Sequence, residues 1–317
     1  MQAYGYNTVR VFIDPGSWTR DSAAHNGIAG DYNVSGLDVN YLNDVVDFVQ
    51  KAEAHGIYVI PSLDGYPHDV YYDGLVTPQN CMDQIDWPNA QVMCAGHVNA
   101  ERQYVTDFVT YLQSHLTASQ LNAILAYQLS NEQTFTSSNL PFVRTDSGFA
   151  PVTADGMSYD MSIPSKRQEA ADSNLVNWAN TLTNAIKPVD SGAMTTVGFF
   201  TYSSVGKPSG PSNLLPAYEN WQGDPCPTTC FPGRPAVLTL YSNVDFVDLH
   251  LYPMGPSYSM NADLASTEWS LIYGPLIMGE YGAFKSAYPD YTSAAYPLRP
   301  GAGCWACHRR PYLWRQE

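Results

Sequence analysis

The feature that most constrains the fold is a repeated alternation of short apolar runs with longer amphipathic segments. Helical spacing of apolar residues covers 42–52 and ends at His55-Gly56, a basic residue followed by a glycine stop. The same spacing recurs over 105–116, and a further helix is expected from about Ser165 to Ala185. Strand-like runs lie between and around these helices, at 7–13, 57–63, 123–129, 195–200, 244–249 and 275–278. Repeated strand–helix–strand order predicts an α/β fold with a parallel sheet.

The spacing of the strands predicts a (β/α)8 barrel of the TIM type. Six strands that begin about 30 to 70 residues apart leave room for helices and for long loops, and 317 residues fit one large domain. In such a barrel the active site gathers at the carboxyl ends of the strands. The longest segments expected to be loops follow strand ends, at 64–98, 133–164, 201–237 and 252–263.

Composition excludes several classes of partner. The net charge is −15 and the sequence pI is about 4.6, so the chain lacks the basic face that binding to nucleic acid or to an anionic membrane requires. No apolar stretch approaches 18 residues, which predicts no membrane span. Charged residues make up only 14%, a balance common in secreted proteins. We therefore expect an extracellular protein whose signal peptide is not in this chain.

The six cysteines form three close pairs, and they allow more than one interpretation. Cys81 with Cys94, and Cys226 with Cys230, lie in Pro/Gly/Asn-rich segments and are interpreted as disulfides that pin loops. Alternatively, Cys226-x-x-x-Cys230 and Cys304-x-x-Cys307 together could hold zinc. The segment Cys304-Trp305-Ala306-Cys307-His308 also matches the attachment pattern of c-type haem. A redox or metal protein is therefore a remote alternative.

Two glutamates close strand-like runs, in Leu129-Ser130-Asn131-Glu132 and in Ile277-Met278-Gly279-Glu280. Carboxylates on neighbouring strand ends are what glycosidic-bond cleavage requires, because one protonates the leaving oxygen and the other attacks the anomeric carbon or activates water. An arginine strand lies upstream, and a His-x-Tyr strand lies between the two segments. This order makes the pair more informative than either segment alone.

The series NTVRVFI, YVIPSLDGYP, AYQLSNE, VDLHLYP and IMGEYG resembles strands two, three, four, six and seven of a clan A glycoside hydrolase. Glycoside hydrolase family 5, the cellulase and mannanase family, is the most similar, and the resemblance covers about Tyr6 to Phe284. It implies a (β/α)8 barrel that cleaves β-linked glucan or mannan chains with retention of configuration. The sequence contains no Gly-rich phosphate loop and no Gly-x-Ser-x-Gly motif, and we expect chemistry without a cofactor.

The resemblance assigns the central roles of the site. Glu132 matches the general acid/base, and Glu280 matches the nucleophile. Arg10, inside an otherwise apolar strand where an unpaired charge would be costly, matches the guanidinium that keeps the nucleophile ionised. Asn131 would donate to the sugar 2-hydroxyl. Plain structural interpretations remain open: a loop glutamate for Glu132, a turn-capping carboxylate for Glu280 and a buried ion pair for Arg10.

Further substrate contacts are expected from neighbouring residues. His250 and Tyr252 alternate on one strand and so face the same side; the resemblance implies that His250 lines the reactive subsite, although a core histidine is the alternative. Asp64 and Tyr66 follow a strand end as candidate sugar contacts. Sugars present apolar faces that stack on aromatic rings, and the candidates are Trp18, Tyr202 and Trp221, each of which could also be an ordinary packing residue. No histidine spacing indicates a metal site.

The two ends of the chain depart from the family pattern. The sequence opens on what resembles strand two, and no eighth strand is recognisable after Glu280. We therefore expect an incomplete barrel over residues 1–298 and an atypical tail over 299–317, for which a non-native origin is our hypothesis. A carbohydrate-binding barrel without catalytic activity is the alternative function. We expect a monomer, although no sequence feature bears on oligomeric state.

Overall fold

The computed structural model describes residues 2–16, 27–29, 36–201, 230–251 and 272–281. Its centre is a sheet of six parallel strands in the order β1-β2-β3-β5-β7-β8. The strands are β1 (Thr8–Phe12), β2 (Tyr58–Ser62), β3 (Ala126–Gln128), β5 (Met194–Phe200), β7 (Phe246–Leu251) and β8 (Leu276–Tyr281). Each corresponds to one of the six expected strands, so the predicted α/β class and parallel sheet are confirmed.

The sheet is curled into an open part of a (β/α)8 barrel. Its first and last strands, β1 and β8, are not paired with each other, yet Arg10 on β1 forms an ion pair with Glu280 on β8. Side chains of the two outermost described strands therefore meet across the concave face. The fold is that of an incomplete TIM barrel, as the sequence predicted.

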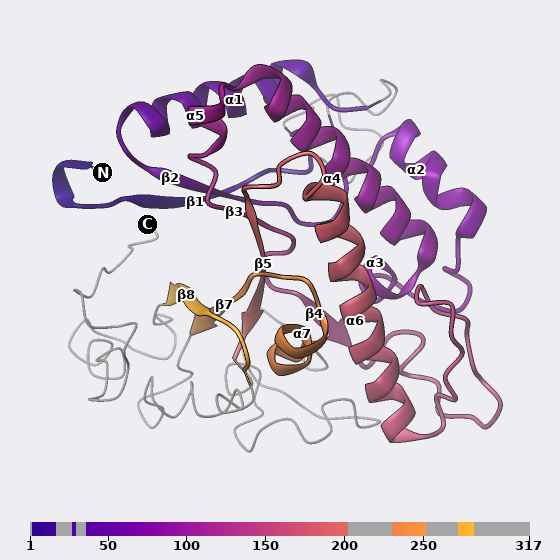
Figure 1. Cartoon of the computed structure of the whole chain (residues 1–317). Coiled ribbons are helices and arrows are strands. Elements are labelled where there is room, and N and C mark those ends of the chain that lie inside the picture. The colour runs from indigo at the N-terminus through magenta and orange to yellow at the C-terminus, as the bar shows by residue number, and fades with distance from the viewer. Residues whose placement is uncertain (1, 17–26, 30–35, 202–229, 252–271, 282–317) are drawn as a thin grey trace, which may run out of the picture.

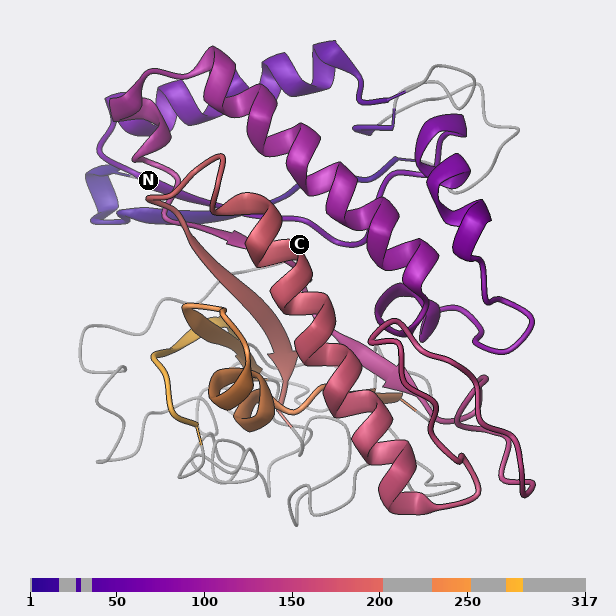
Figure 2. The same ribbon diagram turned by 45° about the vertical axis from the view of Figure 1, so that its right-hand side comes forward.

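Long helices cover the convex face of the sheet, as Figure 1 and Figure 2 show. They are α1 (Val39–Ala54), α4 (Ala95–His115) and α6 (Pro164–Ile186), which match the three helices expected from apolar spacing. The carboxylate of Asp38 caps α1 by accepting a 2.8 Å hydrogen bond from the backbone amide of Tyr41. After the cap at His55, Gly56 adopts φ +65°, which ends the helix where the sequence predicted.

The segments expected to be loops contain short elements that the sequence did not predict. Between β2 and α4 lie α2 (Val70–Val76), the 3₁₀ helix η2 (Thr77–Gln79) and α3 (Ala90–Met93), and α4 itself begins before residue 98. A second sheet pairs β4 (Thr134–Thr136) with β6 (Cys230–Pro232) in antiparallel fashion. The other short elements are η1 (Gln2–Tyr4), α5 (Ala118–Leu121) and α7 (Pro235–Tyr241).

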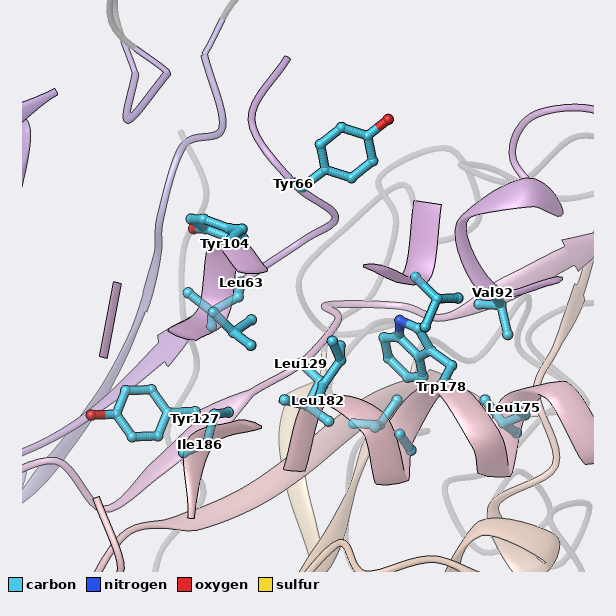
Figure 3. Close-up of a cluster of buried hydrophobic side chains, with 14 of the residues drawn as sticks. Leu63, Tyr66, Val92, Tyr104, Tyr127, Leu129, Leu175, Trp178, Leu182 and Ile186 are labelled. Carbon is cyan, nitrogen blue, oxygen red and sulfur yellow. The ribbon is translucent and has the colours of Figure 1, made fainter. Parts of the chain in front are cut away.

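Period-two alternation of the strands separates an apolar face from a polar face. Tyr127 and Leu129 on and after β3, and Leu249 on β7, point into the main core between the sheet and the helices. Figure 3 shows this core around Trp178, Leu182 and other side chains of α6. The residues between these core positions, including Gln128, Asp248 and His250, are buried on the opposite, concave face.

Other sequence predictions have mixed outcomes. Cys81 and Cys94 form a disulfide, as expected, and it ties the segment after η2 to the start of α4. Cys226, Cys304 and Cys307 lie outside the described residues, as does the whole tail over 299–317. Within the described part of the chain, no helix has the length and apolar character that crossing a bilayer requires.

Candidate active site

Five polar or charged side chains gather on the concave face of the sheet, at its carboxyl end. They come from four strands: Arg10 from β1, Gln128 from β3, Asp248 and His250 from β7, and Glu280 from β8. Strand pairing places His250 directly beside Glu280, with a register irregularity between Leu249 and His250. Because these strands are parallel neighbours or meet across the curl, residues far apart in sequence form one cluster.

Glu280 lies next to a positive charge. Its carboxylate forms an ion pair with the guanidinium of Arg10, and the two side chains are 21% and 12% exposed. The other Glu280 oxygen lies 3.7 Å from Nδ1 of His250. Arg10 also donates 2.8 Å and 2.7 Å hydrogen bonds to the side-chain oxygens of Gln128 and Asn131. The charge in the apolar β1 run, which the sequence identified as costly, is therefore paired.

Glu132 lies just beyond β3 and close to Glu280. Its Oε1 lies 2.8 Å from Nδ1 of the fully buried His250. Side-chain ligand atoms of Glu132, His250 and Glu280 all lie within 4.8 Å of one another, so the two carboxylates face a common point. Such a group could attract a cation, but Arg10 already supplies a positive charge to Glu280.

The turn that carries Asn131 and Glu132 is held against β5 by backbone contacts. The amide of Gly198 donates to the carbonyl of Ser130 at 2.9 Å, and the amide of Gln133 donates to the carbonyl of Gly198 at 3.0 Å. A Cβ at residue 198 would overlap the carbonyl of Asn131, so only glycine permits this approach. The close contact fixes where the strand ends and where the glutamate projects.

His250 has a raised pKa despite its burial. Burial acts to lower the pKa, but hydrogen bonding and charge interactions with Asp248 and Glu132 outweigh it. A protonated His250 donates Nδ1–H to Glu132, and its Nε2 lies 3.6 Å from Oδ2 of Asp248. The histidine therefore lies between carboxylates on three sides, which favour its protonated form.

Asp64 lies on the Glu132 side of the site and lines a cavity of about 170 Å³. Its side chain is exposed in the concave surface, and Oδ1 accepts a 3.0 Å hydrogen bond from Ser130. Desolvation in the cavity raises the pKa of Asp64 against the hydrogen bond from Ser130, with a further contribution from the charge of Glu132. The position is compatible with the sugar contact expected from the sequence.

A buried glutamate that the sequence did not single out also lines this cavity. Glu101 of α4 is 2% exposed, and its carboxylate accepts a 2.8 Å hydrogen bond from the indole N–H of Trp178 on α6. Burial raises the pKa of Glu101 to about 8. The floor of the cavity therefore carries a carboxyl group that is largely protonated near neutral pH.

The structure does not bring every predicted residue to the cluster. Tyr66 is 3% exposed and packs in the core, where its hydroxyl forms a 3.0 Å hydrogen bond with Nδ1 of His97 on α4. Tyr252, Trp18, Tyr202 and Trp221 lie outside the described residues. Arg10, Asn131, Glu132, His250 and Glu280 are brought together, and Asp64 lies beside them.

Two residues of the cluster were missed by sequence reasoning. Gln128 and Asp248 stand within the quoted motifs AYQLSNE and VDLHLYP, where they were treated only as parts of strands. Asp248 precedes His250 by two residues, so the two side chains face the same side of the strand. Gln128 is a buried polar residue between apolar neighbours. These two features were the available signals.

Comparison with solved structures finds glycoside hydrolases among the similar chains. An exo-β-1,4-mannosidase from Opitutaceae bacterium strain TAV5 matches with a TM-score of 0.48 at 15% identity, over 91% of this chain and 42% of that one. A β-1,4-D-mannanase from Cryptopygus antarcticus matches with a TM-score of 0.45 at 18% identity, over 89% and 66%. Endo-glycoceramidase II from Rhodococcus sp. matches with a TM-score of 0.43 at 17% identity, over 91% and 61%.

These matches are distant, and the chain spans only 42% and 66% of the length of the first two. A scan of protein-family models gives no match, and a search of curated proteins gives none either. Any assignment of activity and substrate therefore depends on the side chains of the site.

Proposed function

We propose that the protein is a retaining glycoside hydrolase that cleaves β-linked glycosidic bonds. The observation that carries this proposal is the meeting of Glu132, just beyond β3, and Glu280 on β8, which each place one carboxylate oxygen within 4.8 Å of an oxygen of the other. Retaining enzymes hold their two carboxyl groups about 5–5.5 Å apart, whereas inverting enzymes leave about 6.5–9.5 Å for a water. The close approach of the two carboxylates supports double displacement.

In the first step Glu280 attacks the anomeric carbon, and the bond to the leaving oxygen breaks as Glu132 protonates that oxygen. The product is a covalent glycosyl ester on Glu280. In the second step Glu132 removes a proton from water, whose oxygen attacks the anomeric carbon and releases Glu280. Arg10 supports both steps because its guanidinium stabilises the ionised form of the nucleophile.

The remaining residues have supporting roles in this proposal. Asn131 is oriented by Arg10 and would donate its amide to the sugar 2-hydroxyl. His250 orients Glu132 through the 2.8 Å contact of Nδ1. Asp64 is a candidate contact on the leaving-group side, because it lines the cavity beside Glu132. The family resemblance also implies that the hydroxyl of Tyr252 reaches the nucleophile, and we propose this role for it.

For the substrate we propose a β-glucan or β-mannan chain, with stacking on Trp18, Tyr202 or Trp221 as the sequence suggests. We further propose that the protein acts outside the cell as a monomer. The disulfide between Cys81 and Cys94 supports an oxidising compartment.

The direct test is release of reducing sugar from a panel of β-glucans, β-mannans and xylans. Wild type, Glu280→Ala and Glu132→Ala are compared with Glu169→Ala, an exposed glutamate of α6 that serves as the matched control. We expect turnover by wild type and the control and its loss in both site variants. Anomer-resolved NMR of the first product should show retention. Folded wild type that binds polysaccharide without turnover would instead identify a carbohydrate-binding barrel.

A further inference from the structure

The cluster contains a third carboxylate for which the proposed mechanism has no use. Asp248 on β7 is only 4% exposed, and burial of a carboxylate is costly unless hydrogen bonds and charges compensate. Its Oδ2 accepts a 2.7 Å hydrogen bond from Nε2 of Gln128 and lies 3.6 Å from Nε2 of His250. Asp248 therefore lies beside both Gln128, which contacts Arg10, and His250, which contacts Glu132.

One branch leads from Asp248 to Glu280. The side-chain oxygen of Gln128 accepts hydrogen bonds from Arg10 at 2.8 Å and from Ser62 at 2.6 Å, while its amide nitrogen donates to Asp248. Arginine offers only donors and an ionised aspartate only acceptors, so this orientation of the amide is imposed by its partners. Gln128 thus transmits the position of Asp248 to Arg10, which pairs with Glu280.

The other branch leads from Asp248 to Glu132. His250 is fully buried and faces Asp248 on its own strand, Glu132 after β3 and Glu280 on β8. The Asp248 carboxylate is one of the two groups that raise the pKa of His250 against the effect of burial. Since Nδ1 of the same ring lies 2.8 Å from Glu132, the carboxylate of Asp248 influences the ring that contacts the general acid/base.

The carboxylate of Asp248 fits beside β8 because residue 279 is a glycine. A Cβ at residue 279 would overlap both oxygens and the carboxyl carbon of Asp248. Gly279 directly precedes Glu280, so the residue that admits Asp248 also belongs to the strand that presents the nucleophile. The packing of β8 on β7 and the placement of Asp248 are therefore linked.

We propose that Asp248 is a positioning residue that aligns both carboxyl groups of the site, Glu280 through Gln128 and Arg10, and Glu132 through His250. Its role in turnover rests on the glycosidase function proposed above. The effect of Asp248 on His250 does not depend on that function, so the two roles of Asp248 can be tested separately. Asp248 would touch neither substrate nor the reacting atoms.

The test is Asp248→Asn, which keeps the shape and one acceptor oxygen but removes the charge. The control is Asp190→Asn, since Asp190 is also buried, at 6% exposed, but accepts from Tyr127 on the core side. NMR titration of selectively labelled histidine should show the midpoint of His250 falling by about one pH unit or more in Asp248→Asn. The control should leave that midpoint unchanged.

Kinetics provide the second measurement. In Asp248→Asn we expect kcat to fall about tenfold or more with little change in KM, and the pH–rate profile to shift with His250. Gln128→Met removes the link between Asp248 and Arg10 but leaves the carboxylate of Asp248 beside His250, so kcat should fall while the His250 midpoint stays near its wild-type value. This variant also serves if Asp248→Asn does not fold.

The outcomes are distinguishable. An unchanged His250 midpoint and pH profile in folded Asp248→Asn would overturn the positioning role, as would full activity in Gln128→Met. A wild-type protein without turnover on any glycan would refute the proposed function alone. In that case the NMR midpoint would still decide whether Asp248 controls His250.

Discussion

Replacement of Arg10 by methionine perturbs the site at its centre, because this one side chain links the nucleophile to the rest of the cluster. Arg10 pairs with Glu280 and donates 2.8 Å and 2.7 Å hydrogen bonds to Gln128 and Asn131. With 12% and 21% of the two paired side chains exposed, the ion pair is mostly shielded from water. Methionine has a similar length but neither charge nor donors, so Glu280 would be left near other carboxylates without its cation.

The size of the effect follows from these contacts. Removal of one partner of a buried ion pair typically costs 3–5 kcal/mol, and the residual exposure places this pair at the lower end, at about 3 kcal/mol of unfolding free energy. Arg10→Lys keeps the charge but cannot reach three acceptors with a planar fork, and we expect it to cost about 1–2 kcal/mol. Loss of one charge-stabilising group lowers kcat/KM by about 10²–10³-fold, which we expect for the methionine variant.

The assay is urea denaturation followed by tryptophan fluorescence at pH 7, together with kcat/KM on the best glycan. Arg102→Met, at an exposed position of α4, is the matched control and should change neither quantity appreciably. The reasoning would be refuted if Arg10→Met kept both its unfolding free energy and its kcat/KM within the range of that control. A loss of stability with full activity would show that the ion pair is structural only.

Three other perturbations have defined outcomes. Burial raises the pKa of Glu101 to about 8, so between about pH 4.3 and 8 only the unfolded chain releases this proton. The unfolding free energy of the wild type should therefore fall with rising pH by up to about 1.4 kcal/mol per pH unit. Urea denaturation of Glu101→Gln at pH 5 and pH 8 should lack this pH dependence. Gly279→Ala should lose most activity, because its Cβ overlaps the carboxylate of Asp248; a variant with wild-type kcat would contradict the packing. Replacing Cys81 and Cys94 by alanine removes a crosslink of 13-residue separation and should lower the unfolding free energy by about 2–4 kcal/mol, measured by denaturation without reductant.

The elements that the sequence predicted are those defined by long, regular patterns. The helix over 42–52 and its stop at His55-Gly56 were predictable because apolar periodicity and a glycine with positive φ are local properties. The six strands were predictable because each is an apolar run of limited length between polar segments. Glu132 and Glu280 were predictable as partners because the ends of parallel strands lie at one edge of the sheet.

The short elements and the place of Tyr66 could not be predicted for a different reason. Helices as short as α2 and α3 are not stable alone and form only where tertiary contacts support them. Once they fold, with α4, over the segment that follows β2, Tyr66 is enclosed and its hydroxyl reaches His97. Nothing local in the sequence distinguishes such a tyrosine from one that faces a cleft.

Gln128 and Asp248 show where a sequence contains more information than its motifs. A charge within an apolar strand identified Arg10, because an unpaired charge there would be costly. The same cost applies to Asp248, which stands between apolar residues of β7 with the parity of His250. Because the curled sheet has a single concave face, inward-facing polar residues of different strands must share that face and satisfy one another. When the inward-facing polar residues of all the buried strands are considered together, Arg10, Gln128 and Asp248 are expected to contact one another. The positioning network then follows from the free-energy cost of an unpaired buried charge, which also identified Arg10.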